Sequence, residues 1–144
     1  MVARISRVVA AIGLVVFFLG AFALPWATLT VAGETASIPA AFEVFGPLKG
    51  TTRTVVEVVF IAGAFAAVVA VRARIRPLAW GGVATSSLYL LIILTRIRNT
   101  MAVEASATVD AGAGMAFEVI GLGMVIAATT VWLLCTANNG AQPN

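Results

Sequence analysis

The chain has 144 residues, of which 61% are hydrophobic and only 10% are charged. A soluble globular domain carries about 25% charged residues, so this chain lacks the polar surface that would keep it dissolved in water. The composition therefore predicts a membrane protein with one small domain in the lipid bilayer. The net charge of +3 comes from basic residues at the ends of apolar runs, where such residues determine membrane topology, so we do not expect nucleic-acid binding.

Several kinds of chemistry are excluded by residue counts. Histidine is absent and Cys135 is the single cysteine. These counts exclude histidine-ligated metals and haem, a Ser-His-Asp triad, an internal disulfide and a cysteine-rich metal site. The sequence also contains no P-loop, GxSxG, HExxH or CxxC motif. We therefore expect a protein that is not an enzyme, with no catalytic residue, no metal and no cofactor.

Residues 8–24 form the first predicted transmembrane helix. This uncharged run is just long enough, at about 1.5 Å per residue, to cross a hydrocarbon core of about 30 Å. Arg4 and Arg7 precede it, and Leu-Pro-Trp at residues 24–26 ends it, because proline stops a helix and tryptophan favours the interface. An alternative is a signal peptide with its cleavage site at Ala-Phe-Ala, residues 21–23.

Residues 25–54 are the longest polar stretch and form the first predicted outer loop. Residues 26–31 alternate between polar and apolar side chains, Gly33 lies in a turn-like segment, and residues 35–38 can return as a second strand. Glycines and prolines interrupt the rest of the loop. The pattern predicts a small β-hairpin on the outer membrane face.

An arginine-rich segment at residues 72–77 separates the second predicted span, residues 55–71, from the third, residues 78–95. Three of its residues are arginines and no acidic residue lies near them. Arginine is costly in hydrocarbon, so this segment must lie in water or among lipid headgroups. It is therefore predicted to be the tight inner loop between two membrane hairpins.

The second outer loop is predicted at residues 96–114, and the alternation at residues 103–110 indicates a further strand. The fourth span covers residues 115–134, and the polar tail at residues 136–144 is expected to be disordered. The predicted fold is an all-α membrane protein. It has a single domain of four transmembrane helices, with a small extracytoplasmic β-hairpin or sheet from the two outer loops.

The distribution of charge orients this arrangement. With the N-terminus inside, five arginines lie inside and four basic residues outside, while all six acidic residues lie outside or at outer helix ends. We therefore predict a multi-pass protein of the bacterial cytoplasmic membrane with both termini in the cytoplasm. The tryptophans are expected in interfacial belts, with Trp26 outside and Trp80 and Trp132 inside.

Small residues mark predicted contact faces between helices. Gly63, Ala67 and Ala70 follow a spacing near i, i+4, i+7 on the second span, and Gly121 and Gly123 lie on the fourth. Small side chains allow two helices to approach closely in a membrane. These five positions are therefore predicted to pack against neighbouring helices.

A cluster of charged residues is predicted at the outer ends of the spans. Glu57 and Glu118 lie near the outer ends of the second and fourth spans, and Arg96 and Arg98 close the third. A functional interpretation is a gate for protons, ions or a substrate. The structural alternative is two Arg–Glu pairs that fix how the helices dock. Proximity to the interface, where long side chains snorkel to water, favours the structural interpretation.

Two short segments resemble each other. Residues 41–46 and 116–121 match at five of six positions, with an offset of 75 residues. The match predicts two parallel repeats of helix, strand-like segment and helix. The alternative is a chance match in a chain rich in alanine, valine and glycine.

The short first span, the Leu-Pro-Trp boundary, the Thr/Val-rich loop and the Ala/Val-rich helices resemble the small four-span membrane proteins that are common in actinobacteria. The order of helices and strand-bearing outer loops is also similar to that of claudin-like tetraspans, although the claudin tryptophan motif and loop disulfide are absent. The resemblance covers most of the chain but has no diagnostic motif, so it transfers no site residues.

We expect a non-enzymatic accessory or assembly subunit of a larger envelope or respiratory complex. Its expected partners are the lipid bilayer and either other membrane subunits or further copies of itself. The alternative is an oligomeric channel or transporter component that uses the Glu/Arg cluster at its outer mouth. A membrane-embedded enzyme acting on lipid is the third hypothesis.

Overall fold

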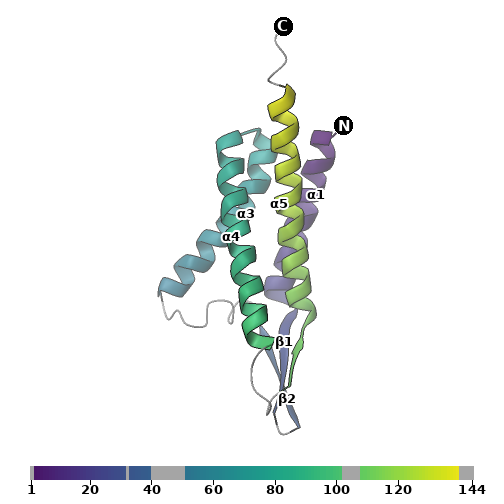
Figure 1. Cartoon of the computed structure of the whole chain (residues 1–144), viewed down its shortest axis with the longest axis vertical. Coiled ribbons are helices and arrows are strands. Elements are labelled where there is room, and N and C mark those ends of the chain that lie inside the picture. The colour runs from purple at the N-terminus through teal and green to yellow at the C-terminus, as the bar shows by residue number, and fades with distance from the viewer. Residues whose placement is uncertain (1, 32, 40–50, 102–107, 140–144) are drawn as a thin grey trace.

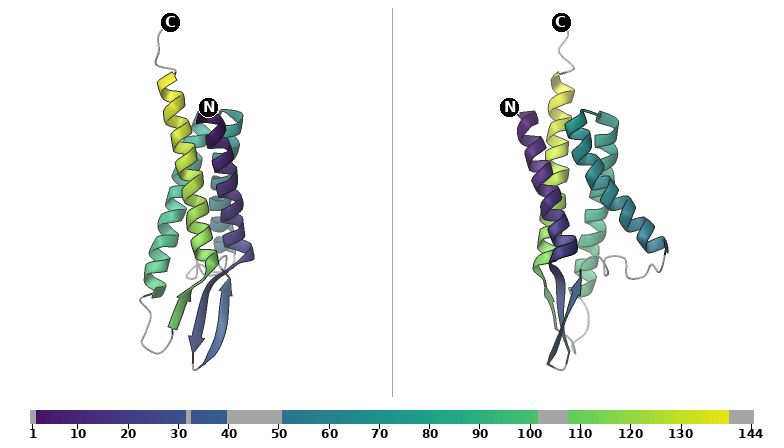
Figure 2. Two further views of the ribbon diagram at one scale, coloured as in Figure 1. Left: turned by 90° about the vertical axis from the view of Figure 1, so that its right-hand side faces the viewer. Right: turned by 180° about the vertical axis from the view of Figure 1, so that it is seen from behind.

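The computed structural model describes residues 2–31, 33–39, 51–101 and 108–139. Long helices run side by side, and a small sheet projects from one end of them (Figure 1). Both termini lie at the opposite end (Figure 2). In chain order the elements are α1 (Val2–Phe18), the π-helix η1 (Leu19–Ala23), β1 (Pro25–Val31), β2 (Glu34–Pro39), α3 (Thr51–Ala73), α4 (Arg76–Met101), β3 (Thr108–Ala111) and α5 (Ala113–Asn139).

Four helical segments in the described ranges are long and apolar enough to cross a membrane. They are Val2–Ala23, Val55–Ala73, Arg76–Thr95 and Ala113–Ala137. Each contains or nearly coincides with one of the four predicted spans, and α1 continues directly into η1 to complete the first. Helix length and composition therefore support a multi-pass membrane protein.

Glycines on both helices bring α1 and α5 into close antiparallel contact. Gly13 on α1 and Gly20 on its continuation η1 are seven residues apart, and so are Gly114 and Gly121 on α5. A Cβ atom on Gly121 would lie 2.6 Å from the Gly13 carbonyl oxygen, and one on Gly20 would lie 2.6 Å from the Gly114 oxygen. A side chain at any of these positions would therefore push the backbones apart. We call these four residues the glycine seam.

The connection between α3 and α4 is a two-residue turn built on Arg74. Its φ is 61°, in the left-handed region, and the Ile75 amide donates a 3.0 Å hydrogen bond to the Ala70 carbonyl. This pattern matches a Schellman motif, which ends a helix by satisfying a free carbonyl group. The arginines of the segment are exposed, as a loop outside the hydrocarbon requires. The predicted tight loop is therefore present, although each helix extends further into residues 72–77 than predicted.

The α3–α4 hairpin packs through small residues near its turn and opens toward the sheet. A Cβ on Gly82 would lie 2.7 Å from the Ala67 Cα atom, and one on Gly63 would lie 2.7 Å from the Thr85 Cβ atom. Beyond this contact the N-terminal half of α3 diverges from the bundle (Figures 1 and 2). Val58, in that half, is more than half exposed.

The two predicted outer loops contribute to one sheet with strand order β2-β1-β3. β1 is central and pairs antiparallel with both neighbours. Gly33 (φ 88°) lies in the β1–β2 turn, where a positive φ favours glycine. The Gly112 amide donates a 2.8 Å hydrogen bond to the Trp26 carbonyl, which ties the start of α5 to β1. The predicted hairpin is present, and the predicted third strand is described only as β3, because residues 102–107 lie outside the described part.

Two of the three tryptophans predicted in interfacial belts are buried in the protein and do not face lipid, and their depth in the membrane stays a prediction. Trp26 and Trp132 are only 1% and 2% exposed, whereas Trp80 is 55% exposed. Trp132 packs with small residues, among them Ala70 and Ala79, near the α3–α4 turn. The large ring of Trp132 fills the space that these alanines leave, so this tryptophan contributes to packing inside the bundle.

Candidate functional site

The most unusual group in the bundle is the carboxyl of Glu118. It lies in the membrane-spanning part of α5 and is 1% exposed. The glycine seam brings the backbone of η1 against this turn, since a Cβ on Gly20 would meet the Glu118 amide nitrogen. The side chain reaches α4, where the Tyr89 hydroxyl donates a 3.0 Å hydrogen bond to Glu118 Oε1. A carboxyl and a phenol are therefore paired inside the bundle.

The second oxygen of this carboxyl has no hydrogen-bond partner. Glu118 Oε2 is buried, and no described residue donates to it. Burying a polar atom without a partner costs roughly 1–3 kcal/mol, and a charged oxygen costs more. Such atoms are few in folded proteins and often mark a place that a ligand, an ion or water completes.

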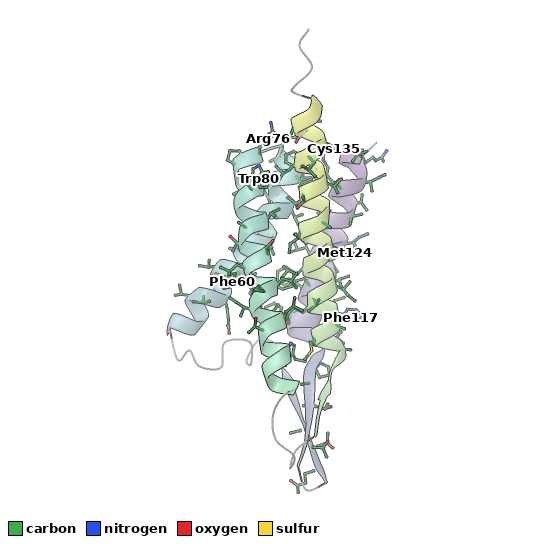
Figure 3. All side chains as sticks on the ribbon, viewed as in Figure 1. Phe60, Arg76, Trp80, Phe117, Met124 and Cys135 are labelled. Carbon is green, nitrogen blue, oxygen red and sulfur yellow. The ribbon has the colours of Figure 1, made fainter. Side chains whose placement is uncertain are left out.

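Aromatic rings fix the position of Tyr89. Phe60 of α3 stacks on it with ring centroids 5.0 Å apart and an interplanar angle of 12°. Phe17 of α1 meets it edge to face at 6.0 Å. Such geometries are favourable for aromatic pairs and restrict how the phenol can turn. Contacts from α1 and α3 therefore hold the Tyr89 ring of α4 with its hydroxyl group directed at Glu118. Phe60 and Phe117, next to Glu118, lie in the half of the bundle nearer the sheet (Figure 3).

A small cavity lies beside this pair. Its volume is about 30 Å³. A water molecule needs about 10–15 Å³ measured in this way, so the cavity has room for one or two water-sized occupants. Residues of α1, η1, α3 and α4 line it: Phe17, Ala21, Phe22, Glu57, Ile61 and Tyr89.

The π-helix η1 forms one wall of the cavity. Its wider winding is closed by the Leu24 amide, which donates to the Leu19 carbonyl at 3.1 Å, a bond between residues i and i+5. Ala21 and Phe22 of this segment line the cavity. Short π-helical turns are rare and frequently occur at functional sites.

The structure brings both predicted acidic residues to this region. Glu57 lines the cavity together with Tyr89, and Tyr89 is hydrogen-bonded to Glu118. The side chain of Glu118 is buried among the helices, so it does not extend to water as a snorkelling side chain would, and its position near the interface stays a prediction. Arg96 and Arg98 belong to α4, but their side chains lie outside the described part, so the Arg–Glu pairs stay a prediction.

The predicted packing residues have different surroundings. Gly63 and Ala67 face α4 and Ala70 is fully buried, whereas Gly121 belongs to the glycine seam. A Cβ on Gly123 would meet nothing within 4 Å, so this glycine allows no close contact. The other half of the predicted repeat, residues 41–46, lies outside the described part, and the repeat stays a prediction.

Sequence reasoning missed Tyr89, the partner of Glu118. A signal was present, because this is the only tyrosine of the chain and it lies inside an apolar span. A hydroxyl group at such a depth needs a hydrogen-bond acceptor. The aromatic neighbours carried no comparable signal, since phenylalanine is common in apolar helices.

No known protein family, curated protein or solved structure matches this chain. The likeness to small actinobacterial four-span proteins and to claudin-like tetraspans therefore stays a resemblance of pattern. The function of the chain is therefore inferred from the geometry of its own residues.

Proposed function

We propose that this chain is a non-enzymatic membrane subunit that acts by docking on other membrane proteins, as an accessory or assembly subunit of a larger envelope or respiratory complex. The observation that carries the proposal is the departure of α3 from its own bundle. Toward the sheet, the N-terminal half of α3 diverges from the other helices (Figure 2), and Val55, Val58 and Val59 are each more than half exposed.

The proposed occupant of this opening is a transmembrane helix of a partner subunit. The other helix pair, α1 and α5, is closed by the glycine seam. In a close-packed pair, each helix exposes only the side that faces away from its neighbour. A helix that diverges from the bundle also exposes the side that would otherwise pack against the bundle. A partner helix can contact the divergent part of α3 and the rest of the bundle together, which favours association through shape.

The sheet is the proposed second contact surface, on the outer side of the bacterial cytoplasmic membrane. It projects beyond the helices at the end opposite to both termini (Figure 1). The basic residues of the α3–α4 turn lie at the termini end, as the positive-inside rule expects of a cytoplasmic side. Its outer strands, β2 and β3, have one unpaired edge each among the described strands, which allows a partner strand to add.

The docking proposal is tested by site-specific photo-crosslinking in cells. A photoreactive amino acid replaces Val58 on the divergent part of α3, and Val15 on α1 is the matched control, since the two are 57% and 60% exposed. We expect one discrete protein adduct from position 58, which mass spectrometry identifies, and no such adduct from position 15. The same partner is expected in a pull-down in mild detergent.

The proposal is contradicted if position 58 gives no protein adduct and the purified chain carries no stoichiometric partner. A homo-oligomer without a partner would favour the second candidate function, a channel or transporter component. The specific observation in its favour is the buried Glu118–Tyr89 pair beside a cavity lined by Glu57. Ion flux in proteoliposomes that is lost in Glu57→Gln and Glu118→Gln, with folding retained, would support it.

A further inference from the structure

We propose that the turn between α3 and α4 binds the phosphate group of an anionic phospholipid, in the membrane leaflet at the termini end of the bundle. Its ligands would be Arg72 at the end of α3, Arg74 in the turn and Arg76 at the start of α4. The side chains of all three are exposed. The turn lies at the opposite end of the bundle from the divergent part of α3 (Figure 1), so the site goes beyond the proposed docking function and does not depend on it.

The sign of the ligand's charge follows from the surroundings of the turn. No acidic residue occurs in the sequence between Glu57 and Glu104. The turn lies at the end of the bundle that carries both termini (Figure 2), whereas the acidic residues of the described part belong to the sheet or to the half of the bundle nearer the sheet: Glu34, Glu57, Asp110 and Glu118. Three guanidinium groups within five residues therefore have no described acid at their end of the bundle, and an anion from outside the chain can bind them.

Arginine is a poor choice for the backbone at two of these three positions. Arg74 has a φ of 61°, and glycine is usual at this position of a Schellman motif because it adopts the left-handed conformation without strain. Arg76 begins α4, where the positive end of the helix dipole disfavours a basic side chain. The positive-inside rule needs only basic residues somewhere in the loop, so it does not explain an arginine with a positive φ. Residues that break local rules in this way are typical of functional sites.

Exposed apolar side chains beside the arginines favour a lipid over a soluble anion. Trp80 is 55% exposed and lies four residues after Arg76, on the same face of α4 (Figure 3). Ile75 and Leu78 are 46% and 39% exposed. Guanidinium groups bind phosphate through paired hydrogen bonds, and tryptophan favours the boundary between headgroups and hydrocarbon. The turn therefore combines ligands for a headgroup phosphate with apolar surface for the acyl chains of the same lipid.

The test uses the full chain in nanodiscs of phosphatidylcholine, with or without phosphatidylglycerol. Thermal unfolding is followed at one ionic strength, and native mass spectrometry counts the phosphatidylglycerol molecules that stay on the chain. We expect about one tightly held molecule per chain. At about one hundred times the Kd, phosphatidylglycerol should raise the unfolding midpoint by about 4 °C. Glycerol phosphate in solution should give no such rise in phosphatidylcholine nanodiscs, because it has no acyl chains to contact the apolar side chains.

Arg74→Gly separates the binding site from the turn itself. It removes the charge and relieves the positive φ, so the midpoint in pure phosphatidylcholine should not fall, while the affinity for phosphatidylglycerol falls about fivefold or more. Arg72→Gln and Arg76→Gln should each weaken binding about fivefold. Arg74→Lys keeps the charge without the planar pair of donors, so its loss should be intermediate. Arg4→Gln is the matched control, because it removes the same charge from an exposed position at the same end and should change the affinity less than about twofold.

The proposal is overturned if phosphatidylglycerol raises the midpoint no more than phosphatidylcholine does. It is also overturned if Arg74→Gly and Arg4→Gln weaken the effect equally, since net charge alone would then explain it. An equal rise from glycerol phosphate in solution would assign the turn to a soluble phosphate and overturn the lipid assignment. An acidic partner protein that co-purifies with the wild type but not with Arg74→Gly, whether or not phosphatidylglycerol is present, would contradict the proposal as well, because the turn would then be a protein-docking surface.

Discussion

The two helix pairs of this bundle are built in different ways. Between α5 and the first span, formed by α1 and η1, glycine faces glycine at two levels, and the backbones approach closely along the seam. Between α3 and α4, glycine faces alanine or threonine near the turn, and the helices then separate toward the sheet (Figure 1). The first pair places Glu118, and the second supplies Tyr89 and Glu57. The close-packed half therefore carries the buried carboxyl, and the more open half carries the two polar residues that line the cavity.

The largest effect should come from the glycine seam. Gly121→Leu would place a side chain where a Cβ alone meets the Gly13 carbonyl at 2.6 Å, so α1 and α5 must separate. Overpacking of this kind costs about 1–3 kcal/mol and more when backbone must move. We expect loss of the monodisperse fold in size-exclusion chromatography.

Gly123→Leu is the matched control for this seam. It lies on the same helix, and a Cβ there meets nothing within 4 Å. This variant should elute and unfold like the wild type. Equal damage from both substitutions would show that the close approach of α1 and α5 is not required for the fold.

A smaller but still large effect is expected for Trp132→Ala at the other end of the bundle. Trp132 is almost fully buried, and its removal leaves a void between α5 and the α3–α4 turn. Replacing a buried aromatic residue by alanine costs about 3–5 kcal/mol in soluble proteins. Thermal unfolding should show a drop of many degrees, whereas Trp80→Ala, at an exposed position, should change the midpoint little. Similar behaviour of the two variants would show that the burial of Trp132 does not contribute to stability.

The contrast between these two tryptophans shows where prediction from sequence reached its limit. Long apolar runs predict all four spans, and the alternation of polar and apolar residues predicts β1 and β2, because each of these patterns is local in the sequence. The burial of Trp132 depends instead on contacts with α3 and α4, which are distant in the sequence. The fourth span is apolar on every side, so its composition does not reveal which side faces lipid and which faces α3 and α4.

Only part of the candidate site can be predicted from the sequence, because only part of it depends on local patterns. Acidic residues inside apolar runs stand out, and Glu57 and Glu118 were found. The Tyr89–Glu118 hydrogen bond joins residues that are 29 positions apart on antiparallel helices. It depends on how far α4 is shifted along α5. The spacing of residues along the chain does not give this shift between helices. The sequence therefore predicts pairs between the glutamates and Arg96 and Arg98, which are closer to Glu118 in sequence than Tyr89 is.

A moderate effect is expected where the two halves meet, at the Tyr89–Glu118 hydrogen bond. Tyr89→Phe leaves the ring stack with Phe60 in place but removes the only described donor to the carboxyl. Leaving a buried acceptor unsatisfied costs about 1–3 kcal/mol. A double-mutant cycle with Glu118→Gln, followed by thermal unfolding, should give a coupling energy of about 1 kcal/mol or more. Additive effects would mean that the two groups do not interact in the membrane.

The smallest effect on folding should come from the divergent part of α3, and this substitution separates docking from stability. Val58 is mostly exposed, so Val58→Ala should change the unfolding midpoint of the isolated chain by no more than surface substitutions usually do, about 0.5 kcal/mol. The same substitution should weaken the capture of a partner subunit in mild detergent, because the side chain lies on the surface proposed to receive a partner helix. Val15→Ala, at an equally exposed position on the closed pair, should affect neither quantity. If both variants leave partner capture unchanged, the divergent part of α3 is not the docking surface.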